Sequence, residues 1–463
     1  MSFNSIIFIF LFLPLTLLFY YGSKKELRNI ILLLASIIFF IWTGINTILI
    51  ILTISLINFA YSYFMSLCQN ETKSSKRKKQ ALLFVALLTN IGALLFYKYT
   101  NFFLETLNLS ETSTLKIIVP LGISYITFQQ ISYIYDIYSN KIKFENKISN
   151  YLLYIMFFPK IVAGPISKYS DFLPQLKERE FSNEIFNLGI QKFSLGLGKK
   201  VIIASTLQTF VDEAFSLNPE NMRTAIILLA MLSYTLQIYF DFSGYTDMAL
   251  GLGNMFGFHL PENFNRPYIA TSVTEFWKRW HISLTSFLRE YLYFPLGGSR
   301  KSYKRTLLNI FIVFFVSGLW HGAAFTFIVW GIYHGVLMII EKIGLYKLLS
   351  KLPKAISLTY TFIIINISWI FFRSETLEYA IHFIKRVFTI GGSDFVGLSQ
   401  FTLNNKFFFI LIIALIIVFF PRRIFKNFKY KESIIKPFSI IVLIYSLSII
   451  ASGSFKPFIY FNF

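Results

Sequence analysis

The chain has 463 residues, of which 55% are hydrophobic and 14% charged, and its formal net charge is +21. So apolar a composition excludes an ordinary soluble globular protein. Apolar runs close to the roughly 20 residues that cross a bilayer recur along the whole chain. We therefore predict an all-α, polytopic membrane protein with about 11 or more transmembrane helices, plus broken or re-entrant helices around a central tunnel.

The transmembrane helices can be placed from the apolar runs in chain order. The first run lacks a basic start and a small-residue cleavage site, so we predict that it is retained as a helix. The predicted spans are residues 3–21, 29–42, 45–67, 81–98, 115–137, 224–240, 307–319, 323–341, 356–372, 406–420 and 437–452.

The basic residues lie in short gaps between these runs, as in "SKKELR", "KSSKRKK", "NKIKFENK", "KLLSKLPK" and "PRRIFKNFKYK". Gaps poor in Lys and Arg, such as "WTGIN" and "NLSETST", alternate with them. This is the positive-inside pattern, which predicts that the basic gaps are cytoplasmic and that both chain termini lie outside. Because the predicted topology explains where the basic residues lie, we expect no nucleic-acid partner. We expect membrane lipids to surround the chain.

The middle of the chain differs from its ends. Between residues 138 and 305 the hydropathy falls and Pro and Gly become frequent, as in "FFPKIVAGPIS". Irregular backbone at membrane depth needs protein or a watery cavity around it. We predict one membrane domain over residues 1–463, with N-terminal spans in 1–137, a catalytic core with re-entrant segments in 138–345 and C-terminal spans in 346–463; residues 373–405 are expected to form an external amphipathic helix and loop.

His281 stands in "TEFWKRWHISLTSFLRE", where apolar residues recur with helical spacing. Such a stripe predicts one continuous helix with a buried face. A histidine on a buried face is either a catalytic group or a hydrogen-bonded core residue, and the spacing leaves both open. The predicted stripe consists of Trp277, Trp280, His281, Leu284 and Leu288.

His321 stands in "FVSGLWHGAAFTF", inside a predicted span and between Trp320 and Gly322. Ionisable residues within a membrane usually face the bundle interior and mark a site. An imidazole suits general-base work because its ordinary pKa lies near neutrality. His334 follows 13 residues later, about 220° away around a continuous helix. The two rings therefore need a helix break to share a cavity, and we expect His334 to make a helix–helix hydrogen bond.

Two charged pairs leave alternatives open. Asp241 and Asp247 stand where a predicted span ends, so they either orient a histidine or substrate or cap the helix end. Arg289 either binds an anionic donor or pairs locally with Glu290. We expect no metal, because no zinc-binding spacing is present.

The segment "FNRPYIATSVTEFWKRWHISLTSFLREYLYFPLGGSR", followed by "WHGAAFTFIVWGIYHG", resembles the membrane-bound O-acyltransferase family, in particular its bacterial alginate and peptidoglycan O-acetyltransferase branch. The elements "FPKIVAGPI", "DFSGYTDMALG" and the terminal "FIYFNF" extend the resemblance over nearly the whole chain. It implies a bacterial inner-membrane enzyme in which His321 is the main catalytic residue and His281 the second. We expect the substrate to contact Trp277, Trp280, Trp320, Arg289 and Asp241.

For this branch the resemblance implies that acetyl-CoA in the cytoplasm donates the acetyl group, with no bound cofactor. It also implies a separate partner, a periplasmic or membrane-anchored acetyltransferase resembling SGNH or GDSL esterases, that receives the group. The chain is rich in Lys, Ile, Phe and Asn, which AT-rich codons encode. This composition favours peptidoglycan over alginate as the polymer. The alternative function is a lipid or glycan transporter with proton-relay histidines, although the two-fold hydropathy repeat typical of transporters is not apparent.

Overall fold

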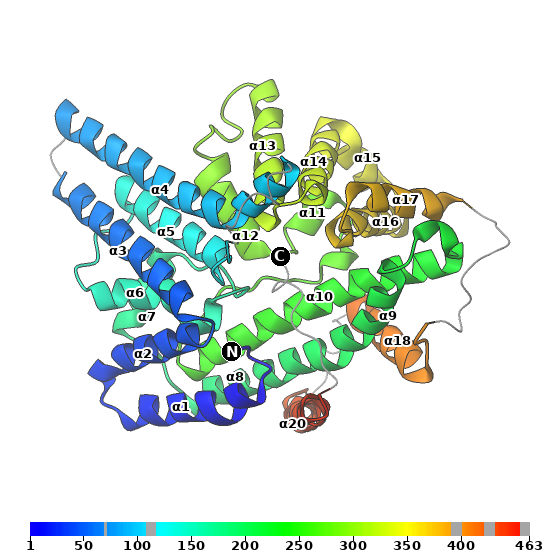
Figure 1. Cartoon of the computed structure of the whole chain (residues 1–463), viewed down its shortest axis with the longest axis horizontal. Helices are drawn as coiled ribbons and strands as arrows, with labels where there is room; N and C mark the ends of the chain where they lie inside the picture. Colours follow the sequence, from blue (N-terminus) through cyan, green and yellow to red (C-terminus); the bar gives the residue numbers. More distant parts are fainter. Residues whose placement is uncertain (69–71, 108–116, 390–400, 421–430, 454–463) are drawn as a thin grey trace. The chain divides into compact units, whose positions relative to one another are not determined.

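The computed structural model describes residues 1–68, 72–107, 117–389, 401–420 and 431–453, and every regular element within these ranges is a helix (Figure 1). This confirms the prediction of an all-α fold. The predicted gap 108–114, residues 421–430 of the next basic gap, residues 390–400 of the predicted external segment and the terminal "FIYFNF" lie outside the described residues.

Six of the described helices are long and apolar enough to cross a membrane. Two shorter apolar helices, Phe8–Gly22 and Asn405–Phe419, add to them. The chain is therefore a multi-pass membrane protein, while the figure of about 11 crossings stays a prediction. The six helical segments are Ile45–Leu67, Lys73–Thr106, Thr224–Met255, Phe325–Lys351, Lys354–Arg373 and Ser433–Ala451.

The chain divides into two compact units. The first comprises Met1–Ile190 with Ala249–Pro261, and the second Gln191–Met248 with Glu262–Phe463. Helices α8 (Asn183–Gly198) and α10 (Thr224–Met255) contribute residues to both. The other α-helices of the first unit are α1 (Leu13–Gly22), α2 (Arg28–Ile41), α3 (Ile45–Leu67), α4 (Lys73–Thr106), α5 (Ile123–Tyr138), α6 (Ile148–Met156) and α7 (Tyr169–Lys177).

Within the first unit, α3, α4 and α5 pack against one another (Figure 1). Large apolar side chains are exposed on α3 and α4, with Phe64 52%, Leu67 61% and Phe84 63% exposed. An exposed apolar surface of this kind suits a helix that faces lipid rather than water.

The second unit carries the predicted site. Its α-helices are α9 (Ser205–Phe215), α11 (Val273–Trp277), α12 (Ile282–Leu288), α13 (Tyr303–His321), α14 (Phe325–Ile340), α15 (Tyr346–Lys351), α16 (Lys354–Arg373), α17 (Leu377–Phe388), α18 (Asn405–Phe419) and α20 (Lys431–Ala451). Three π-helical segments also belong to it, η4 (Lys199–Ala204), η7 (Arg289–Tyr293) and η8 (Glu341–Leu345). Such segments often occur at functional sites.

The middle of the chain is interrupted, as predicted, by short helices: α6 and α7 have 9 residues each, α11 has 5 and α12 has 7. Two predicted boundaries in or next to this region are wrong. Helix α5 starts at Ile123 instead of residue 115, because Pro120 has no N–H and Gly122 adopts a left-handed φ of 76°. Helix α10 continues to Met255 instead of ending at residue 240.

Candidate active site

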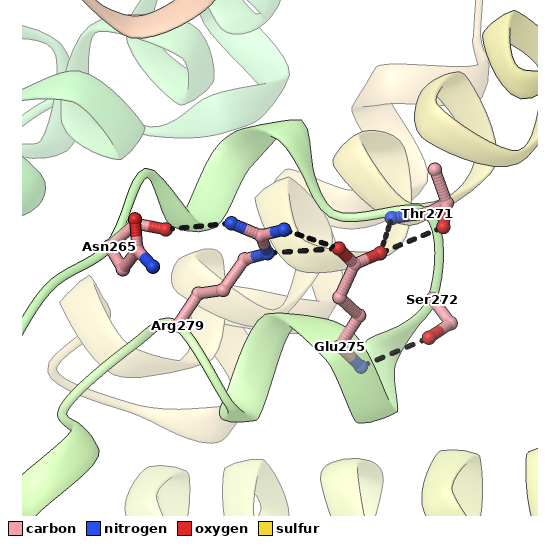
Figure 2. A network of polar contacts seen from close by, with 5 residues as sticks. All are labelled: Asn265, Thr271, Ser272, Glu275 and Arg279. Carbon is pink, nitrogen blue, oxygen red and sulfur yellow. Dashed lines mark hydrogen bonds and ion pairs between the residues drawn. The ribbon is translucent and has the colours of Figure 1, made fainter.

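A polar network fixes the segment that leads to His281 (Figure 2). The Ser272 hydroxyl accepts the Glu275 N–H at 3.0 Å and so caps α11. The Glu275 carboxylate accepts the N–H and the hydroxyl of Thr271, both at 2.8 Å, and two guanidinium N–H groups of Arg279 at 2.9 and 2.7 Å. Arg279 also donates to the Asn265 carbonyl at 3.1 Å. The network therefore ties the residues before α11 to those after it.

The same contacts set the charge of Glu275. Partial burial raises the pKa of its carboxyl, but the Thr271 hydrogen bonds and the Arg279 guanidinium outweigh this effect, so the pKa lies below its ordinary value. Glu275 is consequently ionised at neutral pH and acts as an anchor of the loop rather than as a proton donor.

The backbone breaks at His281, so the prediction of one continuous helix from Trp277 to Leu288 is wrong. Helix α11 ends at Trp277, α12 begins at Ile282, and His281 between them is left-handed, with φ 43° and ψ 52°. Asn263 stabilises the break, because its carbonyl accepts the Ile282 N–H at 3.0 Å and its side chain accepts the Ser283 N–H at 3.1 Å. The burial predicted from the stripe is nevertheless correct: Trp277, Trp280, His281, Leu284 and Leu288 are all buried.

The His281 ring is fully buried among aromatic side chains. Its centroid lies 4.8 Å from that of Phe242 and 6.2 Å from that of Trp320. Among the residues that the structure describes, neither ring nitrogen has a hydrogen-bond partner. The segment lies outside the helices long enough to span the membrane, and burial lowers the pKa of His281 to about 3, which keeps the ring neutral at pH 7. Leaving a buried polar group without a hydrogen bond costs about 1–3 kcal/mol of folding free energy. A substrate group that bonds to a ring nitrogen of His281 recovers this free energy, so the ring is suited to bind substrate.

Glycines bring α13 and α14 together as a hairpin (Figure 1). A Cβ on Gly318 would lie 2.5 Å from the Phe327 carbonyl oxygen, and one on Gly331 would lie 2.5 Å from that of Phe314. The two backbones are thus in direct contact, as small residues in membrane helices permit. Helix α13 ends at His321 and α14 begins at Phe325, which provides the break that the spacing of the histidines requires.

His321, at the end of α13, is 6% exposed and faces three aromatic rings. The ring centroids of Trp320 and Trp330 each lie 5.0 Å from that of His321, and the centroid of Phe372 lies 5.2 Å away. Trp320 therefore contacts both His321 and His281. The structure brings the two predicted catalytic histidines to the same indole, although their chemical roles stay predictions.

His334 makes the predicted hydrogen bond between helices: its Nδ1 accepts the indole N–H of Trp277 on α11 at 3.3 Å. The His334 ring also lies 4.8 Å from that of Trp330. Because Trp330 contacts His321 as well, His334 supports the wall of the candidate site. Trp280 belongs to the same aromatic cluster, with its ring 4.9 Å from that of Trp369.

A cavity of about 610 Å³ adjoins this aromatic cluster. Trp277, Phe314 and Ser317 form part of its wall, and Trp277 and Phe314 also contact the His334 ring. Four basic side chains line the same cavity: Lys278, Arg289, Lys342 and Lys347. Within the described part of the chain none of the four forms an ion pair, which leaves no support for the alternative of a local Arg289–Glu290 pair.

Asp241 has a different environment from the one predicted. It forms an ion pair with Lys200 of η4, and both side chains are 2% exposed. Asp247 pairs with Lys199. Since α10 continues past both carboxylates, they do not cap its end, and that prediction is wrong. The described residues contain no group of three His, Cys, Asp or Glu side chains that could hold a metal ion.

Several residues of the cluster were not predicted. Asn263, Trp330 and Phe372 give no local sequence signal, because Asn263 reaches the break at His281, and Trp330 and Phe372 reach His321, only in the folded chain. His334, whose hydrogen bond was predicted, has a further local signal: Gly-x-x-His-Gly occurs at 318–322 and again at 331–335, once on each helix of the hairpin.

The chain is similar to bacterial acyltransferases over most of its length. It is 37% identical to the Probable alginate O-acetylase AlgI of Pseudomonas aeruginosa, over 92% of this chain and 82% of that protein. It is 36% identical to a Peptidoglycan O-acetyltransferase of Helicobacter pylori, over 86% of this chain and 82% of that one. A Teichoic acid D-alanyltransferase of Bacillus subtilis is 34% identical over 47% of this chain and 58% of its own.

The family model described as MBOAT, membrane-bound O-acyltransferase family, matches residues 37–374. This range contains both predicted catalytic histidines and the whole hairpin of α13 and α14. The chain therefore belongs to the membrane-bound O-acyltransferase family.

Proposed function

We propose that the chain is a membrane O-acetyltransferase that passes acetyl groups from a cytoplasmic donor across the membrane for O-acetylation of a cell-envelope polysaccharide. Relatives named for alginate and for peptidoglycan O-acetylation cover more than four fifths of the chain, and peptidoglycan is the polymer that we favour. The observation that carries the proposal is the placement of two buried histidines against one indole, His281 at 6.2 Å and His321 at 5.0 Å from Trp320.

The chemistry follows from the two imidazoles. A ring nitrogen of His321 takes the proton of the acceptor hydroxyl while the hydroxyl oxygen attacks the acetyl carbonyl carbon. The carbon–sulfur bond of the thioester then breaks, the new ester forms, and the proton passes to the leaving thiolate. His281, neutral and fully buried, forms a hydrogen bond that orients the acceptor.

The donor that we propose is acetyl-CoA, bound in the cavity of about 610 Å³. This volume is within the usual range of about 300–1,000 Å³ for small-molecule sites. The four basic side chains match the phosphates of the nucleotide, and the apolar wall near Trp277 and Phe314 matches the rest of the thioester. Lys347 lies in a gap that the positive-inside pattern assigns to the cytoplasm, where this donor is found.

The acceptor is reached from the other side of the membrane. We propose that a separate periplasmic or membrane-anchored acetyltransferase of the SGNH or GDSL type receives the acetyl group and modifies the polymer. In this arrangement the chain resides in the bacterial inner membrane with both termini outside.

Labelled acetate tests the proposal against transport. We expect vesicles that hold the chain and the esterase-like partner to transfer label from acetyl-CoA to added peptidoglycan as base-labile acetate, and to transfer less to alginate. Vesicles without the chain provide the background. Movement of a lipid-linked glycan across these vesicles, with label on the polymer at background, would establish the transporter alternative instead.

Removing two charges from the cavity should weaken donor binding without impairing the reaction. We expect the double variant R289A/K347A to raise KM for acetyl-CoA roughly tenfold or more, because each cation that meets a phosphate contributes about 1 kcal/mol, while kcat stays within about twofold. Steady-state release of free CoA thiol measures both constants.

The matched control is K304A/K354A, which removes two exposed lysines that do not line the cavity. A second substrate sharpens the result: acetyl-pantetheine has no nucleotide phosphates, so its KM should be the same for the wild type and for R289A/K347A. An unchanged KM for acetyl-CoA in R289A/K347A would place the donor elsewhere.

A further inference from the structure

A second cavity, of about 860 Å³, lies in the first unit, which contains neither predicted catalytic histidine. It is formed by the ends of α3, α4 and α5 and by the segment that follows α5. Its lining combines hydroxyl and amide side chains with apolar ones, which is suited to a ligand with a polar head.

Three lysines line this cavity: Lys76, Lys79 and Lys143. Within the described residues none of them forms an ion pair with a carboxylate, whereas the nearby Lys141 is paired with Asp136 at 3.7 Å. Lys76 and Lys79 are three residues apart on α4 and therefore share one face of the helix. Among the described residues, no carboxylate is paired with the three lysines that bring positive charge to the cavity.

Lys79 is held in place. Its ammonium donates to the Asn140 side-chain oxygen at 2.6 Å and lies 5.9 Å from the centre of the Tyr138 ring. Asn140 has a φ of 58°, a left-handed conformation that asparagine tolerates better than most residues. A lysine fixed in this way loses less conformational freedom when it binds an anion.

An apolar groove of about 570 Å³ lies beside the cavity, between α3 and α4. Phe64, Leu67, Leu82 and Val85 line it, and Cys68 lines both the groove and the cavity. Phe64 and Leu67 are more than half exposed, so the groove opens on the exposed apolar surface of α3 and α4. A basic pocket thus continues into an apolar groove on the same surface.

We propose that this pair of cavities binds one anionic phospholipid of the cytoplasmic leaflet. The three lysines contact the phosphate, the hydroxyl and amide side chains contact the rest of the headgroup, and an acyl chain follows the groove past Cys68. Both "KSSKRKK" and "NKIKFENK" are cytoplasmic in the predicted topology, and basic pockets between membrane helices on that side bind anionic headgroups. A soluble phosphate compound offers the same phosphate to the lysines but has no acyl chain to occupy the groove.

Native mass spectrometry of the purified full-length chain, with phosphatidylglycerol or phosphatidylcholine added to the micelles, tests the proposal. We expect phosphatidylglycerol to be retained in preference to phosphatidylcholine. The triple variant K76Q/K79Q/K143Q should reduce the retained phosphatidylglycerol at least tenfold, since each lysine near an anionic headgroup contributes several-fold to binding. The control triple variant K24Q/K25Q/K177Q removes three exposed lysines of the same unit that do not line the cavity, and should retain the lipid.

The groove has its own variant. A81F fills it with an apolar side chain at an exposed position and should reduce lipid retention while leaving all three lysines in place. The proposal is overturned if the two triple variants retain the same amount of phosphatidylglycerol. It is also overturned if the wild-type chain retains phosphatidylcholine and phosphatidylglycerol equally. Thermal stabilisation by glycerol 3-phosphate that matches phosphatidylglycerol and persists in A81F also overturns it, because the ligand is then a soluble phosphate. Acetyl transfer is not measured, so the result is independent of the proposed function.

Discussion

The variant H321A is expected to reduce polymer-bound acetate at least 100-fold, to the level of cells without the protein. General-base catalysis contributes about 10²–10⁴-fold to rate, and no other described imidazole contacts Trp320 except His281. His281 is not expected to take over, because burial lowers its pKa and so makes its ring a weak base, and because the ring lies on a different segment. Base-labile acetate on purified peptidoglycan is the measurement.

A folding control belongs with this variant. His321 is packed among Trp320, Trp330 and Phe372, so removing the ring leaves a void that can lower stability. H334A removes another buried histidine from the same cluster and provides the comparison. We expect both variants to insert, but H334A to keep acetyl transfer within about tenfold of wild type, since its ring supports Trp277 and Trp330 rather than substrate. Wild-type acetate levels with H321A would rule out the catalytic role.

Most of the fold could be predicted from the sequence because its dominant signals are local. A run such as 45–67 needs no partner to be recognised as a membrane helix, and α3 occupies that range. The start of α5 was misplaced although Pro120 and Gly122 signal it, because hydropathy does not distinguish an apolar helix from the apolar chain before it. The continuation of α10 past residue 240 was missed for the opposite reason, since Asp241 and Asp247 lower the hydropathy of residues that stay helical.

The site could be predicted only in part, because its geometry depends on residues distant in sequence. Helical spacing predicted that His281 is buried, which is correct, but the break at this residue depends on Asn263. Likewise, a carboxylate such as Asp241 gives no sign of the Lys200 ammonium that pairs with it. The contact between Gly318 and Gly331 likewise forms only because the turn between α13 and α14 brings the two helices together.

Substitutions at His281 can separate the ring from the backbone. We expect H281G and H281A to lose acetyl transfer to a similar degree, at least tenfold, because both remove the imidazole that orients the acceptor. They should differ in stability: a left-handed residue other than glycine costs about 1 kcal/mol, so H281G relieves a strain that H281A keeps. Polymer-bound acetate and the thermal midpoint of the purified protein are measured for each variant.

The comparison distinguishes three mechanisms. If activity follows stability, so that H281G is active and H281A is not, then His281 serves only the fold of the break between α11 and α12. If H281A keeps the wild-type level of polymer-bound acetate while H321A loses it, one base is sufficient and the two-histidine mechanism fails. Loss of transfer in both His281 variants, with H281G the more stable protein, supports a ring that acts on the acceptor, since the backbone of H281G is less strained than that of the wild type.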